Sequence, residues 1–290
     1  MTEPIGLFGL GLMGQALAKR LTGAGFGVVG ADPDAGKHAA LLALGGKVAG
    51  PAEVARCARV VLAVFTTDQV EDVVDSTLVP AAGAGKIVLC TSTCDPDRIA
   101  ALAARVAGKG VRLLETPASG SSGQVSRGEG VGLIGGDPRI AAEADDILAA
   151  LFPRRFHIGK AGDAGRAKLA INLILGLNRL ALAEGLVLAE RFGLDPKAFL
   201  DVAKASAAYS QVMDIKGRKM VERDFKPEGF VHQSLKDFTL MRQLAGKLGQ
   251  NLPALELNKS LLEACVRAGE ADHDNSAVIE EIRRRKEPLT

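Results

Sequence analysis

The first half of the chain alternates short, almost wholly apolar runs with longer segments rich in alanine and leucine. Runs without in-out alternation are typical of strands that are buried on both faces. We expect strands at Ile5 to Gly9, Gly27 to Asp32, Arg59 to Phe65, Lys86 to Cys90, Val111 to Glu115 and Gly130 to Gly136. We expect helices at Met13 to Ala24, at Pro96 to Ala107 and from Pro138 onward. Strands separated by helices predict a doubly wound parallel sheet that helices cover on both faces.

The pattern changes after about Gly159, where strand-like runs end and helical periodicity takes over. The longest predicted helix runs from about Ala164 to Phe192, and Gly193 is the glycine expected to stop it. Asp195 and Pro196 form a cap and first-turn pair that opens the next helix. Further helices are expected near His232 to Leu248 and Pro253 to Ala268.

These patterns predict two domains in a chain of 290 residues, a length that accommodates both. The first, over residues 1–160, is the α/β domain, and the second, over residues 161–290, is all-helical and built on the long helix. The apolar content of the second half predicts a surface for partner subunits, and hence a homodimer or homotetramer.

Composition narrows the function classes. The apolar fraction of 47% and the charged fraction of 24% are typical of a well-packed protein. A net charge of only +2 argues against a nucleic-acid face and against binding to a membrane surface. The basic stretch Arg283 to Lys286 is therefore interpreted as a solvated helix end.

One segment, Leu169 to Ala189, is apolar enough to raise the question of a membrane span. Asn172, Asn178, Arg179 and Glu184 interrupt it, and a charged side chain at a bilayer centre costs about 2–3 kcal/mol or more. We interpret the segment as a long helix buried in protein. No signal peptide is evident, because residues 1–4 lead directly into the first predicted strand.

The four cysteines, Cys57, Cys90, Cys94 and Cys265, show no paired metal-ligand spacing, and no metal site is expected. Reduced thiols in a cytoplasmic protein are the simpler interpretation.

A glycine-rich turn follows the first predicted strand. Residues 9–14 read G-L-G-L-M-G and open a helix, which is the G-x-G-x-x-G pattern of dinucleotide-binding sheets. The first glycine permits a tight turn, the second lets the backbone approach a pyrophosphate, and the third lets helix and strand pack closely. The residues expected to contact a cofactor here are Gly9, Gly11, Leu12, Met13 and Gly14.

Asp32 ends the second predicted strand, where a carboxylate can accept hydrogen bonds from the adenosine ribose. A carboxylate there repels a 2′-phosphate, and Pro33 rather than arginine follows it. NAD(H) is therefore favoured as cofactor, while the nearby Lys37 leaves NADP(H) open.

Lys168 stands at the start of the long apolar helix, and Asn172 follows four residues later on the same face. A lysine in an apolar setting either extends its stem to water or has a chemical role. The ordinary pKa of a lysine, about 10.4, is too high for a general base, but desolvation lowers it. An amine there could exchange a proton with a substrate oxygen while Asn172 orients that oxygen. A snorkelling lysine and an interhelical polar contact are the alternative interpretation.

Several blocks along the chain resemble the β-hydroxyacid dehydrogenase family, which includes 3-hydroxyisobutyrate dehydrogenases, semialdehyde reductases and phosphogluconate dehydrogenases. The resemblance covers nearly the whole chain. The blocks are G-L-G-L-M-G at 9–14, S-T-C-D-P at 92–96, E-T-P-A-S-G-S-S-G at 115–123, G-K-A-G-D-A-G-R-A-K-L-A-I-N at 159–172, K-D-F-T-L-M at 236–241 and N-S-A-V-I-E-E-I at 275–282.

The resemblance implies hydride transfer between a nicotinamide and a small 3-hydroxy acid or the corresponding semialdehyde. It makes Lys168 the acid/base and Asn172 its assistant. It assigns the substrate carboxylate to Ser119, Gly120 and Ser121, assigns Lys236 to the nicotinamide and substrate, and gives Asp237 a supporting role there. It also places Val64, Phe65 and Thr93 beside the nicotinamide.

Four departures from the family's motifs leave the substrate open. Ser121 replaces a glycine, Ile171 replaces an asparagine, Phe65 stands where a proline is usual, and Gly165 lies one place after the expected glycine. Two rival functions also remain. One is an imine reductase on the same architecture, and the other is a non-catalytic NAD(P)-binding paralogue, although the retained Lys168 argues against both.

The four histidines form no triad or ligand pattern, and only His232 lies near a motif.

Overall fold

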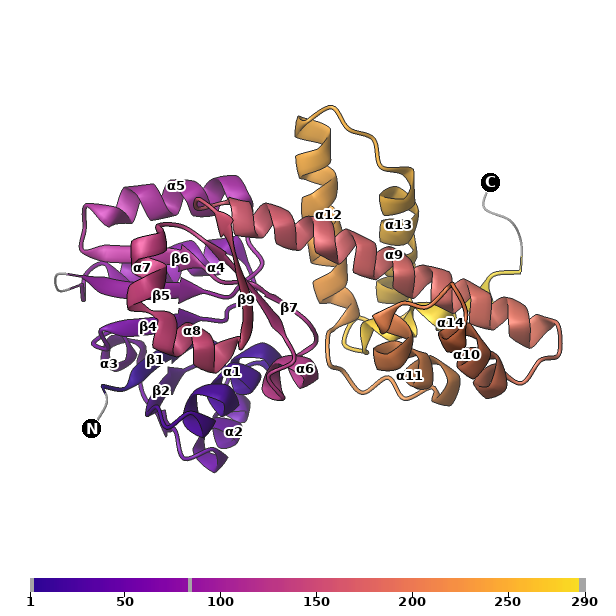
Figure 1. Ribbon diagram of the computed structural model, residues 1–290, viewed down its shortest axis with the longest axis horizontal. Coiled ribbons are helices and arrows are strands. Elements are labelled where there is room, and N and C mark those ends of the chain that lie inside the picture. The colour runs from indigo at the N-terminus through magenta and orange to yellow at the C-terminus, as the bar shows by residue number, and fades with distance from the viewer. Residues whose placement is uncertain (1–2, 83–84, 287–290) are drawn as a thin grey trace. The chain divides into compact units, whose positions relative to one another are not determined.

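The computed structural model describes residues 3–82 and 85–286 (Figure 1). Its contacts divide the chain into two units, Met1–Leu169 and Ala170–Thr290, so the division falls inside the long helix α9 (Asp163–Arg191). The predicted domain boundary at 160/161 lies just before this helix and stays a prediction. Met1 and Thr2, which enter the expectation that no signal peptide is present, lie outside the described residues.

Within the described residues, nine strands of the first unit form one sheet. In chain order they are β1 (Ile5–Phe8), β2 (Val28–Ala31), β3 (Lys47–Val48), β4 (Arg59–Leu62), β5 (Lys86–Cys90), β6 (Val111–Glu115), β7 (Ala118–Ser119), β8 (Val131–Gly135) and β9 (Arg154–Gly159). Their spatial order is β3-β2-β1-β4-β5-β6-β8-β7, and β9 pairs with β8.

The first six strands are all parallel, and their order β3-β2-β1-β4-β5-β6 is that of the doubly wound dinucleotide-binding fold. The predicted sheet is confirmed, with one difference: β8 runs antiparallel to β6. The strands β3, β7 and β9 were not predicted. The first two have only two residues each, and β9 is largely exposed, so none has the apolar run on which the prediction rested.

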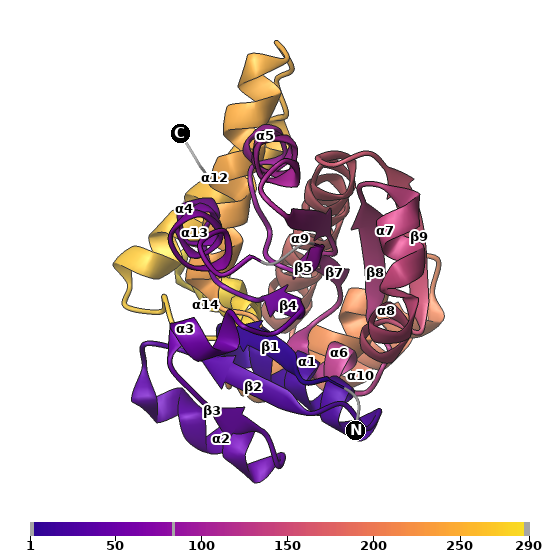
Figure 2. The ribbon, with the colours of Figure 1, turned by 90° about the vertical axis from the view of Figure 1, so that its left-hand side faces the viewer.

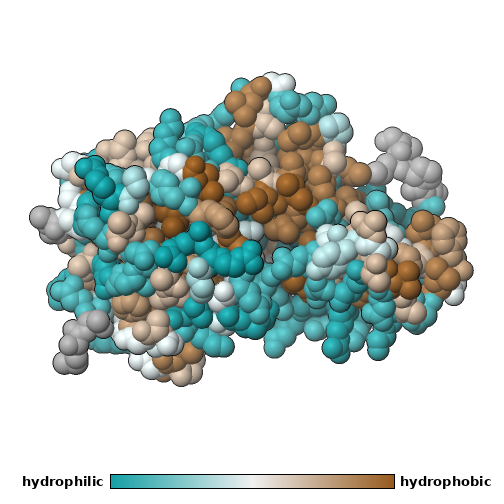
Figure 3. Space-filling view, viewed as in Figure 1, coloured by the Kyte–Doolittle hydropathy of each residue, from teal (hydrophilic) through white to brown (hydrophobic). Residues whose placement is uncertain are grey.

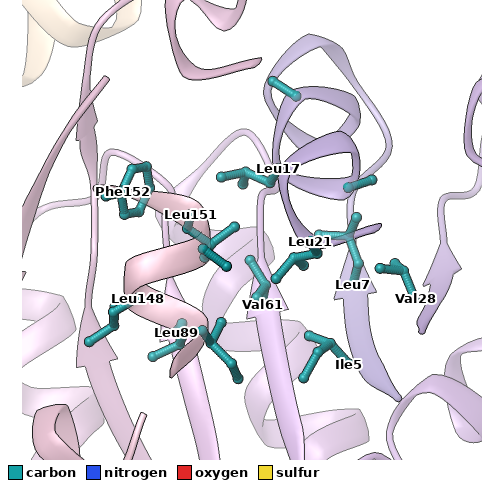
Figure 4. Close-up of a cluster of buried hydrophobic side chains, with 14 of the residues drawn as sticks. Ile5, Leu7, Leu17, Leu21, Val28, Val61, Leu89, Leu148, Leu151 and Phe152 are labelled. Carbon is teal, nitrogen blue, oxygen red and sulfur yellow. The ribbon is translucent and has the colours of Figure 1, made fainter. Parts of the chain in front are cut away.

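Side chains alternate between the two faces of the sheet. Leu7 and Val61 pack with Leu17 and Leu21 on one face, in the cluster drawn in Figure 4. Phe8, Leu62 and Cys90 belong to a second cluster on the other face. Figure 2 shows α1 and α8 on the first side and α4 and α5 on the second. Both faces are therefore covered, as the uniformly apolar strands require.

Several helices of the first unit begin at residues whose side chains cap them. Asp95 accepts hydrogen bonds from the first turn of α5, and Thr66 forms a reciprocal capping box with Gln69 at α4. The α-helices of this unit that precede α9 are α1 (Leu12–Gly23), α2 (His38–Ala43), α3 (Pro51–Val54), α4 (Thr67–Asp72), α5 (Pro96–Ala107), α6 (Ser122–Ser126), α7 (Pro138–Glu143) and α8 (Asp145–Leu151). Shorter 3₁₀ and π turns are η1 (Ala35–Lys37) and η2 (Val73–Leu78).

The second unit is helical throughout its described elements, apart from one isolated bridge between Phe230 and Asp274. The predicted stop and start between its first two helices are confirmed: Gly193 has φ +80°, and Asp195 caps α10 through Ala198 N. After α9, its elements are α10 (Pro196–Ala205), η3 (Met213–Gly217), α11 (Arg218–Glu222), α12 (Val231–Lys247), α13 (Pro253–Arg267), η4 (Asn275–Ala277) and α14 (Val278–Arg284).

A buried ion pair ties several segments of the second unit together. Both carboxylate oxygens of Asp274 accept from Lys216 Nζ, at 2.9 and 2.8 Å. The carboxylate also accepts from the backbone N–H of Glu228 and from the N–H and hydroxyl of Ser276. Burial acts to raise the pKa of Asp274, but Lys216 and these donors hold it below its ordinary value. The neighbouring Arg179 is buried as well, and burial lowers its pKa to about 10.

Helix α9 is the one described helix that is long and apolar enough to cross a membrane, and 39% of its most apolar window is buried. Part of its remaining surface is apolar and exposed. Ile174, Leu188 and Phe192 are exposed by 61%, 54% and 72%, and they lie on one side of the helix with Ala170 and Ala181. Figure 3 shows this apolar surface along α9 and at its C-terminal end. We refer to these five residues as the α9 apolar face.

Removing the central carboxylate should destabilise the second unit. Asp274→Ala leaves the ammonium of Lys216 buried without a counter-ion, which typically costs about 3–5 kcal/mol. The measurement is urea unfolding followed by circular dichroism. Asp272→Ala is the control, because the side chain of Asp272 is 89% exposed, and it should change stability by less than about 0.5 kcal/mol. Equal losses in the two variants would contradict this role for Asp274.

Candidate cofactor and catalytic site

Parallel pairing aligns the ends of five strands at one edge of the sheet. The last residues of β2, β1, β4, β5 and β6 are paired in one row: Ala31, Phe8, Leu62, Cys90 and Glu115. Each strand therefore releases its following loop at the same edge. The predicted site residues Asp32, Gly9 to Gly14, Val64, Phe65, Thr93 and Ser119 to Ser121 all follow within a few residues of this row. Ligands of open parallel sheets bind at this carboxyl edge.

The glycine-rich turn has the geometry expected of a phosphate-binding turn. Gly9 has φ +91°, and a Cβ there would lie 2.4 Å from the carbonyl oxygen of Ala63. A Cβ on Gly14 would lie 1.9 Å from the carbonyl oxygen of Gly9, so helix and turn meet closely. A Cβ on Gly11 would meet no atom within 4 Å. The backbone is thus closely packed at Gly9 and Gly14, whereas the space beside Gly11 is open, and a pyrophosphate would approach there.

Helix α1 begins directly after Gly11, and no side chain caps its first turn. Its first backbone N–H groups, including those of Leu12 and Met13, are therefore available to an anion, and the helix dipole favours negative charge there. These features fit a dinucleotide cofactor.

Asp32, the expected ribose acceptor, is held by the backbone of the glycine-rich turn and of the residues after it. Its carboxylate accepts from Leu10 N at 2.8 Å and from Asp34 N at 2.9 Å, and Lys37 Nζ lies 3.4 Å from it. The carboxylate therefore lies at the glycine-rich turn, next to one ammonium group.

The loops after β4 and β5 are joined by hydrogen bonds. The hydroxyl of Thr91 donates to Leu62 O and that of Ser92 to Val64 O, each at 2.7 Å. These bonds hold Thr93 and Val64 in neighbouring loops. The predicted strand ending at Phe65 was too long, because β4 stops at Leu62. Phe65 instead lies just before α4, 39% exposed, and its N–H donates to Gln69.

The segment predicted to hold a carboxylate bridges a strand and a short helix. Ser119 ends β7, Gly120 has φ +142°, and Ser121 caps α6. The Ser121 hydroxyl accepts from Gln124 N at 3.3 Å, while Ser121 N donates to Gln124 Oε1 at 2.9 Å. The serine that replaces the family's glycine therefore forms a capping box.

Lys168 is buried, with 7% of its surface exposed, in the second turn of α9. Asn172 follows one turn later, and its amide donates to Asp237 Oδ2 on α12 at 3.0 Å. The other oxygen of Asp237 is buried and forms an ion pair with Lys236, whose Nζ lies 3.1 Å from it. The second unit thus brings together three of the predicted residues, Asn172, Lys236 and Asp237.

Other candidate groups have local structural partners. His38 and His157 each contact a backbone carbonyl through Nε2, and His232 stacks on Phe230 with its Nδ1 3.0 Å from Ala271 O. His273 stacks on Phe225. Among residues 3–82 and 85–286, no group of three or more His, Cys, Asp or Glu side chains could hold a metal ion.

Two family models together match most of the chain. Residues 4–159 match the NAD-binding domain of 6-phosphogluconate dehydrogenase, and residues 162–282 match the NAD-binding region of NADP-dependent 3-hydroxyisobutyrate dehydrogenase. The first match alone covers more than half of the chain and includes the glycine-rich turn. The chain belongs to the β-hydroxyacid dehydrogenase family.

Individual members of the family are similar over most of their length. The chain is 32% identical to L-threonate dehydrogenase of Cupriavidus necator, over 96% of each chain. It is 27% identical to glyoxylate/succinic semialdehyde reductase 2 of Arabidopsis thaliana, over 98% of this chain and 81% of that protein. The crystal structure of 3-hydroxyisobutyrate dehydrogenase from Salmonella typhimurium superimposes with a TM-score of 0.89 at 26% identity, over 96% of this chain and 99% of that one.

Two further matches bear on the rival functions. An imine reductase from Pseudomonas sp. shares the fold, with a TM-score of 0.66 at 18% identity, over 97% of this chain and all of that one. The nuclear factor N-PAC of Anopheles gambiae is 29% identical over 94% of this chain but only 49% of that protein. The dehydrogenases and reductases above match over a larger share of their own length than N-PAC does. The chain is thus an NAD(P)-dependent oxidoreductase by its family.

One buried acid, Glu115, lies outside the predicted site residues. Glu115 ends β6, is 3% exposed, and accepts from Gly162 N at 2.6 Å, immediately before α9. Its position as the last residue of a strand, followed by the predicted carboxylate segment, was the available signal. The partner glycines lie 47 residues away and could be found only in the folded chain.

Replacing the open glycine should separate folding from cofactor binding. Gly11→Ala adds a methyl group where no protein atom lies within 4 Å, so the enzyme should fold normally. The methyl group occupies the approach of the pyrophosphate, and we expect the Kd for NAD(H) to rise by about tenfold or more. Titration of NADH fluorescence measures this Kd, and no tryptophan emission contributes because the chain has no tryptophan.

Gly108→Ala is the matched control, because a Cβ there also meets no atom within 4 Å and the residue lies at the end of α5. It should leave the Kd unchanged. Unaltered NADH binding by Gly11→Ala would rule out this turn as the phosphate site.

Proposed function

We propose that this dehydrogenase transfers a hydride between NAD(H) and a small 3-hydroxy acid or the corresponding semialdehyde, with Lys168 as the general acid/base. The observation that carries the proposal is the burial of Lys168 on a helix that begins at the carboxyl edge of the cofactor-binding sheet. The alternative of a snorkelling lysine is disfavoured. A snorkelling lysine keeps its ammonium group in water, whereas Lys168 is only 7% exposed.

The order of the strands supports a direction for the cofactor. Asp32 follows β2 and would take the adenosine ribose, and the glycine turn after β1 would take the pyrophosphate. The other half of the dinucleotide would then extend over β4 and β5, where Val64, Phe65 and Thr93 are predicted to line the nicotinamide. Glu115 ends the next strand and accepts from Gly162 N at the start of α9, which supports a place for Lys168 at the nicotinamide end of this path.

The residues can supply the chemistry around the transferred hydride. When bound, a nicotinamide would supply the hydride acceptor for the carbon that bears the hydroxyl group in the oxidative direction. Lys168, in its neutral form, would accept the hydroxyl proton and become an ammonium group. In the reverse direction, that ammonium would return the proton to the forming alkoxide. Asn172, one turn along the same helix and fixed by Asp237, would orient the substrate oxygen. Ser119, Gly120 and Ser121 would bind the carboxylate through hydroxyl and backbone N–H donors.

NAD(H) remains the favoured cofactor in this proposal. The Asp32 carboxylate at the glycine-rich turn would repel a 2′-phosphate, while Lys37, 3.4 Å away, would attract one. With two donors and one ammonium around it, the carboxylate is held in place, which supports a ribose acceptor. The cytoplasmic location stays a prediction.

Loss of the amine should abolish turnover without loss of cofactor. Lys168→Ala is expected to lower kcat by about a hundredfold to ten-thousandfold, as removal of a general acid/base does, with an unchanged Kd for NADH. Lys160→Ala, which removes an exposed lysine of the same unit, is the control and should keep wild-type kcat. A folded Lys168→Ala enzyme with near-normal turnover would exclude the mechanism.

The substrate class is tested with a panel of glyoxylate and of succinic, methylmalonate and tartronate semialdehydes, with serine and 3-hydroxy acids in the reverse direction. Each is assayed with NAD(H) and NADP(H), and kcat/KM should be higher with NAD(H) for at least one 3-hydroxy acid pair. Cyclic imines are assayed in parallel, and turnover of imines alone would favour the rival reductase. NADH binding without turnover of any compound would favour the non-catalytic paralogue.

The α9 apolar face supports the prediction of a homodimer or homotetramer, because exposed apolar side chains of this size commonly mark an interface. Light scattering should give twice or four times the monomer mass. Leu188→Asp should shift the mass toward the monomer, whereas Leu248→Asp, at an 83% exposed leucine that follows α12, should not. A monomeric wild-type protein would refute the prediction.

A further inference from the structure

We propose that Glu115 is a positioning residue for catalysis: it anchors the first turn of α9 to the end of β6 and thereby fixes the place of Lys168. This inference rests on the proposed function, in which Lys168 is the acid/base. It adds a residue that itself touches neither substrate nor cofactor.

The start of α9 lacks the local means to cap itself. The helix begins at Asp163, and Arg166 N donates to Gly162 O, so Gly162 occupies the cap position and Gly165 the third position of the helix. In a capping box, side chains at these two positions satisfy each other's backbone N–H groups. Glycine has no side chain, so neither position can do so here.

Glu115 supplies the missing acceptor from the neighbouring strand. Its Oε2 accepts from Gly162 N at 2.6 Å, and the N–H of Gly165 also acts as a donor to this carboxyl. One carboxylate therefore satisfies both donors of a capping box across 47 and 50 residues of sequence. A negative charge there is also favoured by the dipole of a 29-residue helix.

Glycines on both sides of the contact make the close approach possible. A Cβ on Gly165 would lie 2.9 Å from Oε1 of Glu115, and a Cβ on Gly135 would lie 2.8 Å from Oε2. The same added atom on Gly135 would lie 2.9 Å from Cβ of Ala164. Glycines on both sides thus let the helix backbone approach the carboxylate, and the approach holds the helix at one depth.

Lys168 follows Ala164 by one turn and Gly165 by three residues, so it belongs to the same side of the helix. Ala164, Gly165, Lys168 and Leu169 are all buried, which defines that side. A displacement of the first turn is therefore passed on to Lys168 through one rigid turn of helix. Displacements of about 1 Å at a reacting group can cost about a hundredfold in rate.

The carboxyl should titrate in the neutral range. Burial raises the pKa of Glu115 to about 7, while the Gly162 and Gly165 donors and Arg166 act to lower it and Asp163 acts to raise it. Cys90 faces it from β5 and adds no charge while protonated, its own pKa being raised. A protonated oxygen must donate, so both N–H groups are fully satisfied only by the ionised form.

These facts give folding stability and activity opposite responses to pH. Because the pKa is higher in the folded chain than its ordinary value of 4.5, the stability contributed by this group is present below pH 4.5 and lost as pH rises through about 7. The fraction of molecules in which Glu115 holds the first turn of α9 should instead increase as Glu115 ionises, and kcat should increase with it. A residue that serves stability alone would move both in the same direction.

The experiment compares Glu115→Gln with the wild type from pH 5 to pH 9. The Gln variant should lower kcat by about tenfold to a hundredfold at pH 8, leave the Kd for NADH unchanged, and lack the rise in kcat near pH 7. Its urea midpoint should fall less between pH 5 and pH 8 than that of the wild type. Glu143→Gln, at an exposed glutamate of the same unit, is the matched control and should behave as the wild type.

Two further measurements keep the test decisive if Glu115→Gln does not fold. Glu115→Asp shortens the side chain by one methylene, and it should fold, keep the rise near pH 7 and have a lower kcat. In the wild type, hydrogen exchange at the Gly162 and Gly165 amides should slow as pH rises through 7, after correction for the intrinsic rate. Wild-type kcat in either variant, or exchange that shows no such change, would overturn the inference.

Failure of the positioning role can be distinguished from failure of the proposed function. If Lys168→Ala keeps wild-type turnover, the proposed function fails. If Lys168→Ala is inactive and Glu115→Gln keeps both kcat and its pH profile, only the positioning role fails.

Discussion

Parallel pairing in one register is the constraint on which the rest of this structure depends. Five strands end together because their last residues, from Ala31 to Glu115, form one row across the sheet. Each following loop must then leave at the same edge, whatever its sequence. A turn for phosphate, an acceptor for ribose and the loops that would face a nicotinamide are therefore neighbours, although they come from separate parts of the chain.

Two helix N-termini at this edge serve opposite purposes. Helix α1 begins after a glycine with open space above it, and no side chain caps it, so its N–H groups are available to a ligand. Helix α9 also begins at a glycine, but Glu115 accepts its free N–H groups. The same kind of orphan donors would thus bind a cofactor in the first case, and they bind the protein's own carboxylate in the second. The difference is that β6, a strand distant in the sequence, supplies an acceptor at the start of α9, whereas the cap residue of α1 makes no side-chain hydrogen bond.

Two buried or partly buried polar residues of the second unit have specific partners. Asn172 is fixed by Asp237, and Lys216 by Asp274, and each of these contacts joins segments that are distant in the sequence. Buried ionic groups add little net stability, but they are costly to leave unpaired, so they restrict the packing to one arrangement. The opposite side of α9 is the α9 apolar face, so a single helix presents both a polar and an apolar surface.

The sequence by itself determined the strands of the parallel sheet, the glycine-rich turn and the limits of the long helices, because these depend on local periodicity and on caps within a few residues. Pro96–Ala107 and the Asp195 cap were predicted to the residue. Family motifs also identified Lys168. Only the tertiary structure decided the short or exposed strands β3, β7 and β9, the partner of Asn172, and the role of Gly162 and Gly165 as donors to Glu115. The two hydrogen-bonded contacts join residues 65 and 47 positions apart, and the three strands are short or exposed, so no local apolar pattern predicts these features.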